Sequence, residues 1–201
     1  METHTLFDTP LFVFRPVGRE DLDDALVSRL VQEADQTEGL QRFNYGGWHS
    51  EDDLSLRTEP CFRNLMEMTH QAVREALTAV AVGRRVTVPE NVVLETNAWS
   101  MVMRYGDYAT LHDHAEAHFS TVYYPDAGES TAQSGGITFV DGRRGGARVP
   151  GISLDPTEFT LCPQSGMLLV FPGWLQHYVH PYLGECPRVS IASNVRISLD
   201  S

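Results

Sequence analysis

The stretch most informative about the fold is Gly166-Met-Leu-Leu-Val-Phe-Pro-Gly-Trp-Leu-Gln-His177. A glycine, a short apolar run and a Pro-Gly bend are typical of a buried strand that is bounded by turns. Such a strand would deliver the side chain of His177 at the edge of the core. The stretch therefore predicts a β-rich fold in which a histidine lies at the end of a core strand.

Similar short runs rich in Val, Ile, Thr, Tyr and Phe fill the chain after Gly83. They predict strands at 86–88, 92–105, 118–124, 136–140, 157–161, 167–171 and 188–197, preceded by one at 11–14. Apolar residues at helical spacing predict two helices, at about 19–38 and 59–82. Helices followed by many strands indicate a mainly β sandwich or barrel with a helical flank.

The composition fits a single domain and narrows the choice of partners. With 201 residues, 42% of them hydrophobic, the chain can bury a core without disulfide or metal staples. A formal net charge of −12 disfavours nucleic-acid binding, because a surface that binds nucleic acid is normally basic. Three cysteines without close pairing, no long apolar run and no signal-peptide pattern predict a cytoplasmic protein that does not enter a membrane.

The eight histidines of the chain are unevenly spread. His112 and His114 lie close together, and His177 follows the apolar run described above. If His112 and His114 share one strand, their side chains face the same side, and Glu116 continues that side. Imidazoles that converge from segments distant in sequence are typical of a metal site. The alternative is a solvated loop rich in histidine.

Arg188 and Ser190 share one face of a strand that is otherwise apolar. An arginine in such a strand needs an anionic partner, because burying an unpaired guanidinium is costly. The partner is either an internal carboxylate or the carboxylate of a ligand, which Arg188 would grip with two hydrogen bonds and the Ser190 hydroxyl would help to hold.

Short motifs along most of the chain occur in a characteristic order. They are Phe7-x-x-Pro10, Asn44-x-Gly-Gly-Trp-His-Ser50, Asn97-x-Trp99, Gly106 before His112-x-His114, Ser120-x-Val-Tyr-Tyr124, Ser134-Gly-Gly-Ile-Thr-Phe139, Gly166 to His177, and Arg188-x-Ser190 to Asn194. Together they resemble the Fe(II)/2-oxoglutarate-dependent dioxygenases, more narrowly a bacterial and phage group of small members. The resemblance implies a double-stranded β-helix, which is a jelly-roll, cupin-like barrel. It implies one oxygenase domain over residues 1–201, with a helical buttress at 1–85 and the jelly-roll core at 86–201.

The resemblance also assigns the site residues. It makes His112, His114 and His177 the catalytic metal ligands, and Arg188 and Ser190 the residues that bind the distal carboxylate of 2-oxoglutarate. The usual triad is two histidines and a carboxylate in an H-x-D/E arrangement, but His114 stands where the acid is expected. Either the iron has three histidine ligands, or His114-Ala-Glu116 supplies the acid. The flanking motifs favour the three histidines.

The activity that the resemblance implies is oxidation, most commonly hydroxylation, of an unactivated C–H bond. Fe(II) would be the cofactor and 2-oxoglutarate the co-substrate, with release of succinate and CO2. The substrate would be a small molecule such as an amino acid or a specialised metabolite, and a homodimer is expected by analogy. Two alternatives stay open: a cupin-type metalloenzyme that does not use 2-oxoglutarate, which leaves Arg188 without a role, and a non-enzymatic jelly-roll module that binds a ligand.

Overall fold

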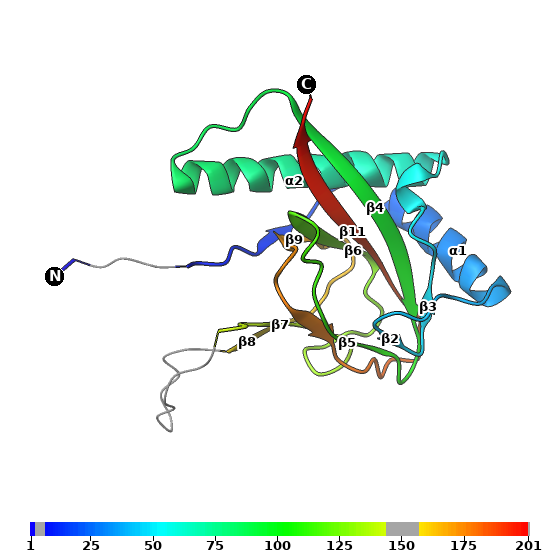
Figure 1. Ribbon diagram of the computed structural model, residues 1–201. Coiled ribbons are helices and arrows are strands. Elements are labelled where there is room, and N and C mark those ends of the chain that lie inside the picture. Colours follow the sequence, from blue (N-terminus) through cyan, green and yellow to red (C-terminus); the bar gives the residue numbers. More distant parts are fainter. Residues whose placement is uncertain (3–6, 144–156, 201) are drawn as a thin grey trace.

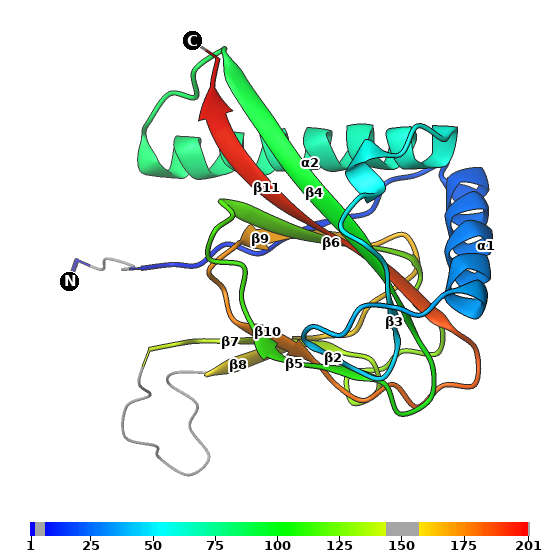
Figure 2. The same cartoon turned by 45° about the vertical axis from the view of Figure 1, so that its right-hand side comes forward.

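The computed structural model describes residues 1–2, 7–143 and 157–200. Two antiparallel sheets face each other, and two helices cover the outer side of one of them (Figures 1 and 2). Within the described residues, neither helix has both the length and the apolar character that crossing a bilayer requires. The layers are therefore helices, a six-stranded sheet and a five-stranded sheet.

Each sheet combines strands from distant parts of the chain. The six-stranded sheet has the order β1 (Phe12–Phe14), β9 (Leu168–Pro172), β6 (Phe119–Asp126), β11 (Arg188–Leu199), β4 (Val92–Met103) and β3 (Trp48–His49). The five-stranded sheet has the order β2 (Asn44–Tyr45), β5 (Tyr108–His112), β10 (His177–Val179), β7 (Ile137–Val140) and β8 (Glu158–Leu161). Since consecutive strands often lie in opposite sheets, the chain winds around the space between them.

The helices are amphipathic and close the outer side of the six-stranded sheet. Helix α1 (Glu20–Gln36) packs on β6, and α2 (Pro60–Arg84) packs on β9. Leu26 and Leu30 of α1 and Phe62 of α2 are fully buried in the core that they form with the sheet. Pro60 opens α2 at a position where a missing N–H costs nothing.

Strand β11 shows how the sheet serves both the core and the inner space. Its residues Val189, Ile191 and Val195 face the helices and belong to their core. Arg188 and Ser190 alternate with these residues and face the cavity between the sheets. Because side chains of a strand alternate between two faces, one strand supplies apolar packing to one side and polar groups to the other.

The predicted fold class, a mainly β double-stranded β-helix with a helical flank, is confirmed. Both predicted helices form, with ends that differ from the prediction by at most two residues. The strand predicted at 86–88 is wrong: this segment is irregular and lies between α2 and β4, and Val86 is exposed. The short strands β2, β3, β5 and β10 were not predicted, because two to five residues carry little periodicity.

Candidate metal and anion site

A cavity of about 130 Å³ lies between the two sheets. A cluster of three histidines lines it, and so does Arg188. Apolar side chains form much of the remaining wall, namely those of Met103, Ile137, Phe171 and Val179. Basic groups thus share an enclosed space with apolar walls.

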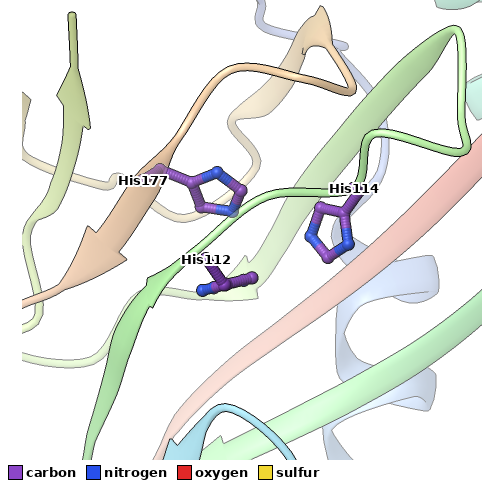
Figure 3. Close-up of side chains that lie close together, drawn as sticks. All are labelled: His112, His114 and His177. Atoms are coloured by element: carbon purple, nitrogen blue, oxygen red, sulfur yellow. The ribbon is translucent and has the colours of Figure 1, made fainter. Parts of the chain in front are cut away.

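The three histidines come from two neighbouring strands and one loop. His112 is the last residue of β5, and His177, the first of β10, lies opposite it in the sheet. His114 follows in the loop after β5, anchored because its backbone N–H donates to the carbonyl of Gly173 at 2.7 Å. One nitrogen from each ring lies within 4.8 Å of the others, and Figure 3 shows the rings around a common space. Three imidazoles at this spacing can bind one metal ion.

Two of these histidines have a fixed tautomer. The Nδ1 atom of His112 lies 2.7 Å from the carbonyl oxygen of Thr110, and that of His177 lies 2.9 Å from the carbonyl oxygen of Leu175. A carbonyl only accepts, so both Nδ1 atoms carry the proton and both Nε2 atoms keep a lone pair. This hydrogen bond from the non-ligating nitrogen is typical of histidines that bind metals.

His114 is held differently from the other two. Its Nδ1 atom lies 3.5 Å from the side-chain amide of Asn194, whose Oδ1 accepts from the Ser120 hydroxyl at 2.9 Å. A side-chain amide offers both a donor and an acceptor. The tautomer of His114 therefore depends on a side chain, whereas backbone carbonyls determine those of His112 and His177.

All three imidazoles are neutral at pH 7. Burial, followed by the nearby charge of His112, lowers the pKa of His177 to about 3. The same two causes lower the pKa of His114 to about 4. Burial also lowers the pKa of His112. Neutral imidazole is the form that binds metal, so these histidines need lose no proton at neutral pH.

Arg188 is buried without an acidic partner in the described part of the chain. Its side chain is 1% exposed, and its Nη1 lies 3.3 Å from the Ser190 hydroxyl and 3.5 Å from the sulfur of Met103. The guanidinium also lies 5.1 Å from the centre of the Tyr124 ring. Neither Arg188 Nε nor the Tyr124 hydroxyl has a hydrogen-bond partner among the described residues. Burial lowers the pKa of Arg188 and raises that of Tyr124. These groups together can bind an anion.

The segment that carries these residues matches a known protein family. Residues 97–194 fit the family model described as "Putative 2OG-Fe(II) oxygenase". The chain carries a 2OG-Fe(II) oxygenase domain. The three histidines, Arg188 and Ser190 of this oxygenase all lie inside the matched segment. A comparison with curated protein sequences gives no match.

Solved structures confirm the fold of the oxygenase. A Pseudomonas putida prolyl-4-hydroxylase is 15% identical, with a TM-score of 0.61 over 94% of this chain and 92% of that one. HygX from Streptomyces hygroscopicus, solved with nickel and 2-oxoglutarate bound, is 15% identical, with a TM-score of 0.60 over 94% of this chain and 83% of that one. SnoN, a non-haem α-ketoglutarate-dependent epimerase from nogalamycin biosynthesis, is 13% identical, with a TM-score of 0.64 over 96% and 81%.

Glu116 of the oxygenase lies away from the histidine cluster. Strand β5 ends at His112, so the expectation that His112, His114 and Glu116 continue along one strand is wrong. The Glu116 side chain is 88% exposed, and its carboxylate pairs with Arg196 at 2.8 Å. The chain turns after His112, which brings His114 toward the cluster and leaves Glu116 on the surface.

Three residues around the cavity of the oxygenase were given no role from the sequence, although Tyr124 and Asn194 belong to the motifs quoted above. Asn194 contacts His114, Tyr124 contacts Arg188, and Asp52 lines the cavity from a loop before α2. Asn194 and Tyr124 have a signal in the sequence, because each is a polar residue in the inward-facing register of an apolar strand. No local pattern marks Asp52, because its place depends on how the loop folds against the sheet.

Proposed function

We propose that the protein is an Fe(II)- and 2-oxoglutarate-dependent dioxygenase that oxidises an unactivated C–H bond of a small molecule. Hydroxylation, with release of succinate and CO2, is the expected outcome. The observation that carries this proposal is the buried guanidinium of Arg188, which has no acidic partner among residues 7–143 and 157–200 and shares a cavity with three neutral histidines. A cupin-type metalloenzyme without 2-oxoglutarate would have no use for that unpaired charge.

The histidine cluster fits the metal that this function needs. His112, His114 and His177 would hold Fe(II), since each offers one nitrogen and all three are neutral at pH 7. Bound iron would supply the activation of oxygen. The backbone carbonyls of Thr110 and Leu175 would keep two of the rings oriented by holding the proton on Nδ1.

The basic pocket fits one end of 2-oxoglutarate. Arg188 would bind the distal carboxylate, with the hydroxyls of Ser190 and Tyr124 beside it. A carboxylate accepts two parallel hydrogen bonds from a guanidinium, which orients as well as binds it. The structure of HygX with nickel and 2-oxoglutarate bound supports this co-substrate for a protein of the same fold.

The apolar walls have a role in the same chemistry. Met103, Ile137 and Phe171 line the cavity and would keep bulk water away from the reacting atoms. Excluding water strengthens electrostatic interactions and prevents side reactions. The volume of about 130 Å³ fits a co-substrate and part of a small substrate rather than a polymer.

Succinate formation tests the proposed function. The purified protein is incubated with Fe(II), 2-oxoglutarate and oxygen, beside the variants His177→Ala and Arg188→Ala, with the exposed Arg63→Ala as matched control. Slow formation of succinate in the wild type and in Arg63→Ala, and none in the other two, is expected. Metal binding without affinity for 2-oxoglutarate would favour the cupin-type alternative. Ligand binding that survives metal removal would favour a non-enzymatic module.

A further inference from the structure

The wall of the cavity carries polar groups that the proposed function does not use. Asp52 and His49 line the cavity together with Arg42. All three come from the segment between α1 and α2 rather than from the strands that carry the metal and anion site. These groups face whatever molecule enters beside 2-oxoglutarate.

Asp52 has one carboxylate oxygen that is bound and one that is not. Its Oδ2 accepts from Arg42 at 2.9 Å. Its Oδ1 is buried and has no hydrogen-bond partner among the described residues. An unpaired buried carboxylate oxygen is unfavourable, and a donor from a ligand would relieve it. Asp52 therefore offers an acceptor to a molecule in the cavity.

His49 offers a second acceptor nearby. Its Nδ1 lies 2.6 Å from the carbonyl oxygen of Ser50, so that atom carries the proton and Nε2 keeps the lone pair. Burial lowers the pKa of His49, so the ring stays neutral near pH 7. The ring stacks on Trp99 at 5.9 Å, and Trp99 lies 5.5 Å from His114. One aromatic ring thus separates His49 from the histidine cluster.

The polar groups of the cavity wall differ in character. Arg188 brings an unpartnered donor, whereas Asp52 and His49 bring acceptors beside Arg42, whose charge Asp52 already pairs. Cations are also favoured at long range, because the chain carries a formal net charge of −12. A molecule that pairs with these acceptors must bring hydrogen-bond donors, and the net charge of the chain favours a positively charged one.

We propose that the substrate is a cationic small molecule whose protonated amine binds Asp52 and His49 in the cavity wall. The proposal rests on the proposed function, because it assumes that Arg188 binds 2-oxoglutarate in the same cavity. The amine anchors the substrate, and Trp99 forms the floor between that anchor and the histidine cluster. The oxidised carbon lies on the part of the substrate that extends from the amine toward the cluster.

Binding of matched amines tests the proposal. Ligand-observed NMR is recorded on the full chain with Zn(II) and 2-oxoglutarate, using a panel of diamines, amino alcohols, amino sugars and basic amino acids, each beside its N-acetylated counterpart. Amines of the panel are expected to bind at least about tenfold more tightly than their neutral counterparts, because acetylation removes the charge that Asp52 compensates. Equal binding of the acetylated compounds, or no binding by any amine, would overturn the proposal.

Three variants test whether Asp52 is the group that binds the amine. Asp52→Asn is expected to weaken amine binding at least about tenfold, whereas Asp52→Glu retains most of it. Glu51→Gln is the matched control: it removes the same charge from the exposed neighbouring position and is expected to change binding by less than about threefold. Thermal unfolding of each variant shows whether it is folded. Amine binding that survives in folded Asp52→Asn would contradict the proposal.

The same samples separate this proposal from the proposed function. Affinity for 2-oxoglutarate is measured in each of them by calorimetry. If 2-oxoglutarate binds and no amine does, the amine site is refuted and the proposed function stands. If amines bind through Asp52 and 2-oxoglutarate does not bind, the proposed function is refuted and the amine site stands without it.

Discussion

Arg57 and Arg188 are both largely buried, yet their surroundings differ in kind. Each guanidinium lies close to an aromatic ring, 5.0 Å from the ring centre of Phe62 for Arg57 and 5.1 Å from that of Tyr124 for Arg188. Arg57 also pairs with Glu33 at 2.7 Å and with Asp53 at 3.2 Å. Arg188 has no carboxylate beside it in the described part of the chain.

The protonation equilibria of the two arginines follow this difference. Burial lowers the pKa of Arg57, but the hydrogen bonds to Glu33 and Asp53 outweigh it and raise the pKa above the ordinary value. Burial lowers the pKa of Arg188 without any such compensation from a carboxylate. A buried arginine whose acids are in place stabilises the fold, whereas one without them is arranged for an anion that comes from outside.

The largest effect is expected on the affinity for 2-oxoglutarate. Arg188→Met should weaken binding by at least about 100-fold, because charge-assisted hydrogen bonds to the distal carboxylate are lost in a buried site. Arg57→Met should leave the affinity within about twofold, since Arg57 lies outside the cavity. Anaerobic calorimetry with Fe(II) measures both. Equal losses in the two variants would remove the functional distinction between these arginines.

The free energy of unfolding should respond differently to the same substitution at the two arginines. Arg57→Met is expected to lower the free energy of unfolding by about 1–3 kcal/mol, because Glu33 loses a partner in a partly buried position. Arg188→Met should be neutral or raise it by about 1–3 kcal/mol in the ligand-free protein, because an unpaired buried charge is removed. Urea unfolding at pH 7.5 gives both values. A strongly destabilised Arg188→Met would show that Arg188 supports the fold.

Because of the histidine cluster, the stability of the metal-free protein should depend on pH. The pKa of His177 is about 3 in the folded chain, against about 6.5 when unfolded. The unfolded state therefore binds more protons below about pH 6.5, and the stability of the metal-free protein falls as the pH is lowered toward 3. In EDTA, the protonation of His177 in the unfolded state should lower the free energy of unfolding by about 1 kcal/mol between pH 6.5 and 5.5. Urea unfolding of His177→Gln should show a correspondingly smaller slope, and an unchanged slope would argue against a neutral buried His177.

The smallest effect concerns the hydroxyl beside Arg188. Ser190→Ala removes one hydrogen-bonding group and should weaken binding of 2-oxoglutarate by about fivefold. Ser198→Ala is the control on the same strand, because Ser198 contacts Glu95 outside the cavity. The same calorimetric titration measures both variants. No change in Ser190→Ala would leave Arg188 as the sole anchor of the two.

The sequence predicts those parts of the site that lie on long strands. The alternation of Arg188 and Ser190 with apolar residues along β11 places both in the cavity, as expected. The face of Glu116 could not be predicted, because β5 ends at His112 and a turn follows. Asp52 could not be predicted either, since its position depends on contacts of a loop with a distant strand. The division of the chain at residue 85, the homodimer and the roles of the site residues stay predictions.

Strand β11 supplies residues both to the hydrophobic core and to the cavity, so activity depends on the same register that the core needs. Val195 is packed against the helices and Asn194 beside His114, so neighbouring residues of one strand serve the two sides of the sheet. A one-residue slip would exchange the two sets, presenting valines to the histidines and pressing Arg188 against leucines. Turnover would thus report on the correct register of β11. A single residue inserted into this strand would move the residues after it to the opposite face of the sheet.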